Sequence, residues 1–235
     1  MHTKLLAAAA GLSLAAGAAS AKTVEFVFTD SLAPTTSYSQ TVDGLTVTIT
    51  AGSFVNGFNF GDSPQVTLND ENSNPVDGYI ATNNTYDDDA VVDPDSNGLG
   101  VINNSSAGTD DQDEVDGSNW DDFLILSFSG DVQLKWAKFG DYDANDDFRI
   151  FYDFSGDGVL GDGDFLTYKE DGNPFSSFPV VTTDLFGFAA TDKKDNWKLK
   201  KLKVHYTPVP LPAAGFMLLA GLGGLAAMKR RKRAS

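Results

Sequence analysis

Cysteine is absent from this 235-residue chain, and histidine occurs only twice, as His2 and His205. The lack of cysteine excludes disulfide bonds, thiol catalysis and cysteine-ligated zinc sites. Basic residues are also scarce, because 17 lysines and arginines stand against 33 aspartates and glutamates and give a net charge of −16. A general nucleic-acid-binding protein needs a basic face for the phosphates, so this composition argues against that class.

The sequence also lacks the motifs that mark common catalytic sites. It has no H-E-x-x-H pair, no Walker loop and no G-x-G-x-x-G run that opens a helix. His205 lies near the C-terminal end of a β-rich stretch with no nucleophile elbow beside it. Two carboxylates suffice for glycoside hydrolysis, but such pairs arise by chance in so acidic a chain. We therefore expect no enzymatic activity, and a polysaccharide hydrolase is the remaining alternative.

Residues 1–21 have the features of a secretory signal peptide. Lys4 supplies a positive charge, and Leu5–Ala16 form an apolar run. Ala19 and Ala21 complete a small-x-small cleavage site, so we expect the Sec machinery to export the chain and the mature protein to begin at Lys22. A buried alanine-rich helix is the alternative.

Residues 208–235 contain a second targeting pattern. Ala213–Met228 are apolar and uncharged, and the basic cluster Lys229–Arg233 follows at once. As a helix the apolar run spans about 24 Å, less than the roughly 30 Å of a membrane core, and snorkelling basic side chains make up the difference. We expect a transmembrane helix over 213–228 with its basic end in the cytoplasm. A nucleic-acid-binding patch is the alternative.

The proline-rich stretch before this run resembles a known sorting signal. The motif Val209, Pro210, Leu211, Pro212 and Ala213, then a Gly/Leu/Ala-rich span and a basic end, resembles the VPLPA variant of the PEP-CTERM signal of exported proteins. The Pro-Glu-Pro core of the better-known form is absent. The resemblance implies recognition by an exosortase-type protease of the inner membrane and delivery to the cell surface or matrix, often beside exopolysaccharide. It implies no activity, and it leaves open whether the tail is cleaved or retained.

The body between the two ends, Lys22–Pro208, keeps all 33 acidic residues and 11 basic ones, which gives a net charge of −22. Short runs of β-branched and aromatic residues recur between turn residues, and no stretch has a helical period. This pattern predicts a single all-β domain, an antiparallel β-sandwich or jelly roll. The expected strands are Thr23–Thr29, Thr36–Val42, Leu45–Ala51, Gln65–Leu68, Gly98–Ile102, Phe123–Ser129, Val132–Phe139, Asp147–Asp153, Phe165–Tyr168, Phe186–Ala190 and Trp197–Tyr206.

The segment Asn69–Asn119 interrupts this pattern, because it is rich in Asn, Asp, Ser and Gly. Apart from its one expected strand, we expect a long acidic loop that is functional or disordered. The runs Asn97–Val101, Val115–Gly117 and Leu124–Phe128 resemble a pattern in the bodies of PEP-CTERM proteins, to which no chemistry is attached.

An acidic loop, Asp153–Asp164, matches the EF-hand template for calcium binding. Oxygen-bearing side chains stand at positions 1, 3 and 5, glycine at 6 and a carboxylate at 12. Aspartate instead of glutamate at 12, and strand-like flanks, depart from the template. A solvated hairpin loop is therefore the alternative. The expected Ca²⁺ ligands are Asp153, Ser155, Asp157, the carbonyl of Val159, and Asp164.

A second loop just upstream begins with the same D-x-D-x-N spacing, in Asp141, Asp143 and Asn145. It has no glycine at position 6, and position 12 is Tyr152. We interpret it as a partial metal site or a helper shell for the first loop.

The last expected strand changes phase along its length. Trp197 and Leu199 share one face, and the alternation resumes one residue out of step from Leu202, which predicts a β-bulge at Lys200-Lys201. The opposite face either binds an anion or is a solvated face whose lysines discourage edge-to-edge pairing. Its residues are Lys198, Lys200, Lys201, Lys203 and His205.

These features favour an exported surface or matrix protein, structural or interactive in role, which calcium stabilises and which associates with extracellular polysaccharide. The alternative is a calcium-dependent, lectin-like carbohydrate-binding module in which Trp120, Trp136 or Tyr79 stacks on sugar rings. Trp136 lies on an apolar alternation, so we expect it in the core, and we expect Trp120 at the surface.

Overall fold

The computed structural model describes residues 20–54, 66–69, 75–80, 86–87, 90–102, 113–117, 121–156, 160, 165–167, 170–190 and 194–208. Every regular element in these ranges is a β-strand, and every strand pair is antiparallel. The prediction of an all-β antiparallel fold is therefore confirmed for this part of the chain. No helix suited to crossing a membrane occurs in it.

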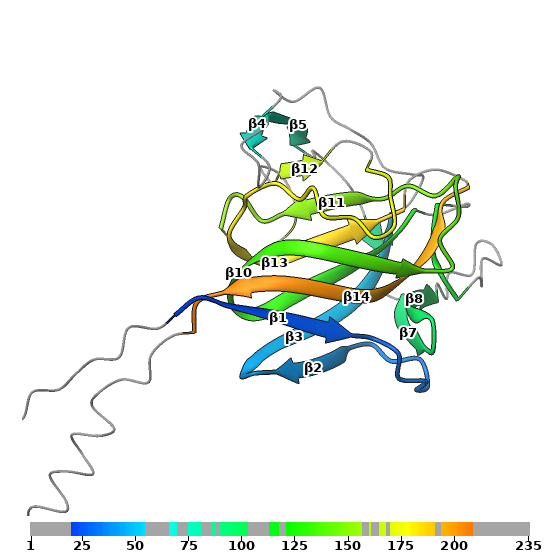
Figure 1. Ribbon diagram of the computed structural model, residues 1–235. Coiled ribbons are helices and arrows are strands. Elements are labelled where there is room, and N and C mark those ends of the chain that lie inside the picture. Colours follow the sequence, from blue (N-terminus) through cyan, green and yellow to red (C-terminus); the bar gives the residue numbers. More distant parts are fainter. Residues whose placement is uncertain are drawn as a thin grey trace, which may run out of the picture. The chain divides into compact units, whose positions relative to one another are not determined.

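One compact unit, Ala21–Thr207, contains all the strands (Figure 1). The strands are β1 Lys22–Val27, β2 Tyr38–Val42, β3 Leu45–Phe54, β4 Val66–Asn69, β5 Pro75–Ile80, β6 Tyr86–Asp87, β7 Val91–Asp95, β8 Gly98–Ile102, β9 Val115–Asp116, β10 Asp121–Gly140, β11 Arg149–Tyr152, β12 Phe165–Thr167, β13 Thr183–Ala189 and β14 Asn196–Tyr206.

Strand β10 organises this unit. It runs for 20 residues through two expected strands and through Gly130, with a register shift between Ser127 and Val132. Its first half lies between β3 and β13, and its second half pairs with β14. In Figure 1 the second half of β10, β14 and β1 lie side by side in front of β3 and β13. Gly130 therefore marks a bend within one strand and does not separate two strands.

Aromatic side chains fill the interior between these strands. The ring of Phe128 lies 6.0 Å from Phe26 of β1 and 5.9 Å from Phe186 of β13, measured between centroids. Phe139 lies 5.0 Å from Trp197 of β14 and 6.2 Å from Phe188 of β13. Full burial of such side chains stabilises the fold by about 1.5–3 kcal/mol each.

The acidic segment Asn69–Asn119 contains more structure than its composition predicts. Strands β5, β6, β7 and β9 lie in it as well as β8, so the expectation of a long loop was wrong at these positions. β7 and β8 form a hairpin in which Val92 is fully buried and pairs with Val101. Val91–Asp95 contains a proline and two aspartates, so its sequence alone does not predict a strand. Its pairing with β8 supplies the apolar contacts that stabilise it.

Glycines in β8 and at the end of β10 allow backbones to approach closely. A Cβ on Gly100 would lie 1.8 Å from the carbonyl oxygen of Asp113, and one on Gly140 would lie 2.0 Å from that of Asn97. Gly98 has φ +145°, a conformation that favours glycine. The glycine spacing in Asn97–Val101 therefore has a structural reason, which is the docking of this hairpin.

The predicted β-bulge in the last strand is confirmed. Lys138 of β10 pairs with Lys201, and the next residue, Phe139, pairs with Leu199, so Lys200 is the extra residue. β10 has a bulge of its own at Lys135, because Leu134 pairs with Val204 and Trp136 pairs with Lys203.

Candidate functional site

The first expected calcium ligand, Asp153, lies directly after β11 and is 5% exposed. Its Oδ1 accepts hydrogen bonds from the Ser155 hydroxyl at 3.2 Å and from the Gly156 N–H at 2.6 Å. Its own N–H donates to the Leu185 carbonyl at 3.3 Å, which ties the turn to β13. Gly156 has φ +72°, so the chain turns sharply here around the Asp153 carboxylate.

The other expected ligands, Asp157, Val159 and Asp164, lie outside the described residues. Within the described ranges, no three or more His, Asp or Glu side chains are grouped so that they could hold a metal ion. The set of calcium ligands therefore stays a prediction. Of the predicted loop, the structure describes the turn Asp153–Gly156 and Leu160.

A surface hollow of about 480 Å³ lies beside this turn. Phe154 on its wall is 54% exposed, whereas most large apolar side chains in the described ranges are buried. The hollow thus offers carboxylates, hydroxyls and one ring to a ligand. Its lining residues are Asp131, Asp153, Phe154, Gly156, Thr182, Thr183 and Asp184.

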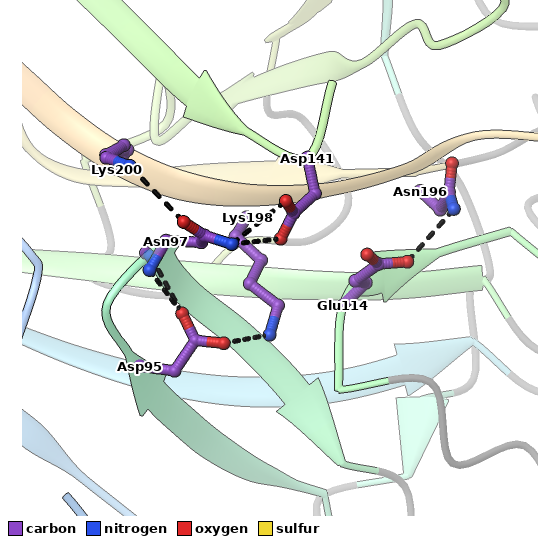
Figure 2. Close-up of polar contacts among 8 residues, drawn as sticks. Asp95, Asn97, Glu114, Asp141, Asn196, Lys198 and Lys200 are labelled. Carbon is purple, nitrogen blue, oxygen red and sulfur yellow. Dashed lines mark hydrogen bonds and ion pairs between the residues drawn. The ribbon is translucent and has the colours of Figure 1, made fainter. Parts of the chain in front are cut away.

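The upstream loop directs its expected ligands to separate partners. The Asp141 carboxylate accepts from the Asn97 side-chain amide at 3.0 and 3.2 Å (Figure 2). Asp143 Oδ1 accepts the Asn145 N–H at 2.7 Å, in a local turn. In these contacts Asp141 holds a neighbouring hairpin while Asp143 shapes its own loop. A helper role toward calcium remains a prediction.

The loop is built around Asp146, which the sequence reasoning did not single out. Asp146 is 3% exposed, and its carboxylate accepts the backbone N–H groups of Asp143 and, at 3.1 Å, Asn196. Burial raises the pKa of Asp146, although these two hydrogen bonds oppose the rise. Nearby, the Trp197 indole N–H donates to the Asp147 carbonyl at 3.1 Å. The acidic loop is therefore fixed to the start of β14.

A polar cluster surrounds Lys198 on β14 (Figure 2). Lys198 was expected on the exposed face of the last strand, but only 4% of it is exposed, so that placement was wrong. Its ammonium pairs with the Asp95 carboxylate, which also accepts the N–H groups of Asn97 at 2.5 Å and Gly98 at 3.1 Å. The β7–β8 hairpin covers this lysine because the hairpin docks on β14 at Leu199.

The carboxyl groups of this cluster differ in acidity. Burial opposes ionisation of Asp95, but the hydrogen bonds from Lys198, Asn97 and Gly98 outweigh it and lower its pKa. Burial raises the pKa of Glu114, which accepts the Asn196 amide at 3.0 Å. The cluster thus holds two parts of the chain against β14: the β7–β8 hairpin, and Glu114, which directly precedes β9.

Another perturbed carboxyl group, Glu170, lies beside Phe148. Their backbones exchange hydrogen bonds of 2.9 and 3.0 Å in an isolated bridge. Burial, with a smaller contribution from the neighbouring Asp171, raises the pKa of Glu170 to about 7. No sequence motif marked this residue, because its burial depends on distant strands.

Trp136 is half-buried and lies on the outer face of β10, so its expected place in the core was wrong. The bulge at Lys135 shifts the alternation of β10 and turns Trp136 outward. The Lys203 ammonium lies 5.2 Å from the centre of the Trp136 ring. The side chains of Trp120 and Tyr79 lie outside the described part of the chain.

Most residues of the two targeting motifs lie outside the described residues. Ala21 directly precedes β1, whereas Ala19 and the sorting motif Val209–Ala213 lie beyond the described ranges. Comparison with protein-family models, curated proteins and solved structures finds no match for this chain. Its function must therefore be argued from its own residues.

Proposed function

We propose that this chain is an exported structural or interaction protein of the cell surface or extracellular matrix, sorted by an exosortase-type system. The observation that carries the proposal is the extent of the compact unit, Ala21–Thr207, which matches the body left between the two targeting patterns. Lys22 of β1 pairs with Tyr206 of β14, so the first and last strands close the body on each other. All the described strands lie within this unit, which suits removal of the two ends.

The body is a two-layer β-sandwich in this proposal. The two halves of β10 belong to different layers, with β3 and β13 beside the first half and β14 and β1 beyond the second. Rings from both groups meet in the interior, as in the Phe26–Phe128 and Phe128–Phe186 contacts, which supports two facing layers.

Mass spectrometry of the native protein tests the export proposal. The expected mature species begins at Lys22 and ends between Pro208 and Ala213, in a surface or extracellular fraction. A species that begins at Lys22 and ends at Ser235 would mean a membrane-tethered surface protein. An intact chain from Met1 to Ser235 in the cytosol would contradict export.

Calcium stabilises the body in this proposal, through the loop that starts at Asp153. Extracellular modules bind Ca²⁺ with dissociation constants of about 10⁻⁴ to 10⁻³ M. At 10 mM Ca²⁺ the weaker value corresponds to about 1.4 kcal/mol of added stability, or a rise in Tm of roughly 3–6 °C. Protection of the Asp153–Asp164 region from proteolysis should accompany it.

Asp153→Asn is the matched variant for this test, because an amide oxygen can still accept the Gly156 N–H while the charge is lost. We expect the variant to resemble the parent protein in EDTA and to lose most of the calcium response. An unchanged Tm and cleavage pattern of the parent protein at millimolar Ca²⁺ would disprove the calcium claim.

A calcium-dependent carbohydrate-binding module is the second candidate. The hollow beside Asp153 favours it, since the exposed Phe154 lines this hollow together with Thr182 and Thr183. A glycan array with and without EDTA separates the two: a discrete, chelator-sensitive sugar preference that Phe154→Ala abolishes supports the lectin.

A further inference from the structure

The outer face of β10, β14 and β1 concentrates positive charge on an otherwise acidic body. On β14, Leu202, Val204 and Tyr206 are buried, so the alternating residues between and beside them point outward. Five of the eleven basic residues of the body lie on this surface, and Glu25 is its one acidic residue among those described. We call this surface the basic sheet face, and its residues are Thr23, Glu25, Gln133, Lys135, Trp136, Lys138, Lys200, Lys201, Lys203 and His205.

Protection of an edge does not explain these lysines. β14 pairs with β10 on one side and with β1, β8 and β9 on the other, so it is an interior strand. Lysines that discourage edge-to-edge pairing belong on strands with an unpaired side. The pairing of β14 therefore removes the edge-protection role from the alternative offered by the sequence, and a plain solvated face is the alternative that the binding test must exclude.

The arrangement of the charges is costly to the fold. Lys138 and Lys201 lie directly opposite each other on neighbouring strands, and like charges in this position are destabilising. Glu25 offsets part of the repulsion, at 3.3 Å from Lys203 and 3.7 Å from Lys201. Lys138, Lys200, Lys201 and Lys203 carry four positive charges, and Glu25 supplies one negative charge. Among the described residues, this part of the face therefore retains excess positive charge for a partner.

We propose that the basic sheet face binds an anionic polysaccharide, with lysines at its carboxylate or sulfate groups and Trp136 against a sugar ring. The face is a paired sheet surface three strands wide, which suits a linear chain more than a small molecule that needs a pocket. Trp136 adds an amphipathic ring at its centre, within reach of Lys203.

A sugar polymer fits the charge better than a nucleic acid does. Duplex DNA carries one charge per about 1.7 Å, and the remaining acidic surface would repel so dense an anion. A glycan with about one charge per ring matches a few spaced ammonium groups. At physiological salt, screening over about 8 Å lets the local lysines outweigh distant carboxylates.

Binding of the purified full-length chain to immobilised polymers, in EDTA, tests this inference apart from export and calcium. The probes are polygalacturonate, dextran sulfate, neutral dextran, polyglutamate and duplex DNA. The test variant is Lys138→Gln/Lys201→Gln. Lys22→Gln/Lys194→Gln is the control, because it removes the same charge from two exposed lysines off this face. The C-terminal basic cluster is the same in every variant, so differences report on the body.

We expect the parent chain to bind polygalacturonate or dextran sulfate, whichever carries the matching anion, and to ignore neutral dextran. The test variant should lose at least tenfold in affinity and the control less than twofold. Trp136→Ala should weaken binding to the sugar polymer several-fold and leave polyglutamate unaffected. Equal affinities of test and control variants would overturn the proposal. So would tighter binding of DNA or of polyglutamate, which would indicate a nucleic acid or an acidic protein segment as partner.

Discussion

Gly100 and Gly130 both lie in β-strands, yet their surroundings differ completely. A Cβ at position 100 would collide with the Asp113 carbonyl at 1.8 Å, whereas one at position 130 would meet no atom within 4 Å. At the scale of single residues, the fold depends on which glycines permit a close approach of two backbones. The sequence alone does not distinguish these two positions.

Gly100→Ala should destabilise the protein by about 2–3 kcal/mol, because β8 must move away from Asp113 to admit a methyl group. Gly130→Ala is the control and should leave the free energy of unfolding unchanged or raise it by up to about 1 kcal/mol. Urea denaturation of both variants measures the difference. Similar losses for the two would mean that backbone contact at Gly100 is not limiting.

Glu170 gives a pH dependence with a definite sign. Its folded-state pKa of about 7 lies above its ordinary value, so the native state holds the proton more tightly than the unfolded chain does. The associated stability is present at acidic pH and is lost as the pH rises through about 7.

Glu170→Gln should therefore match the parent protein near pH 4, below the ordinary carboxyl pKa, and exceed it at pH 8, by about 1 kcal/mol after allowance for partial solvent exposure. Thermal unfolding of both proteins from pH 4 to 8 measures this. Parallel curves over the whole range would show that Glu170 is already ionised in the native state.

At the scale of elements, the β7–β8 hairpin is attached to β14 by a buried ion pair. The side chain of Lys198 is 5% exposed and that of Asp95 is 34% exposed. The ion pair is therefore only partly shielded from water, on the side of Asp95. Removal of one partner from such a pair leaves the other without its counter-charge.

Lys198→Met should cost about 3 kcal/mol, near the lower end for a buried pair because Asp95 is partly hydrated. The double variant with Asp95→Asn should lose clearly less than the sum of the two single losses. Lys201→Met, at the exposed Glu25 pair, should cost under about 1 kcal/mol. Chemical denaturation of the four variants tests the coupling, and simple additivity would contradict it.

The sequence predicts most of these elements because their apolar alternation and turn residues agree. Gly98–Ile102 is found with the same bounds as expected, and the bulge at Lys200 follows from the phase of the alternation. β7 was missed because Val91–Asp95 is short and acidic, so its strand character comes from its partner β8 and from a bridge between Val92 and Thr35. The local sequence pattern predicts a strand that has its own apolar alternation. It does not predict a strand that forms only because a neighbouring strand pairs with it.

The candidate sites are predicted less well, for a related reason. The turn at Asp153 follows from local spacing and is found in the described residues. The burial of Lys198, the outward turn of Trp136 and the raised pKa of Glu170 all depend on strands distant in sequence. From the sequence alone, a lysine on a solvated strand face cannot be distinguished from a lysine that a distant hairpin covers.

On the scale of the whole molecule, the net charge of −22 on the body opposes compaction. Its carboxylates repel one another over distances that salt shortens, from about 30 Å at 0.01 M to about 3 Å at 1 M. Stability should thus respond to simple salt as well as to any specific cation.

Raising NaCl from 0.01 to 0.5 M should increase Tm by several degrees through this screening. CaCl₂ at the same ionic strength should increase it further only if the Asp153 loop binds the ion. Parallel thermal scans of the parent protein and Asp153→Asn in both salts separate the two effects. A Tm that falls with NaCl would show that attractive ion pairs outweigh the general repulsion.

The pairing of Lys22 with Tyr206 brings the first and last strands of the body together at one corner. A pulling force applied at Thr207 would therefore act directly on β14, which pairs with β10 on one side and with β1 and β9 on the other. The body would therefore bear such a force through a strand that is hydrogen-bonded on both sides. Lys22 would stay next to the point where the force is applied.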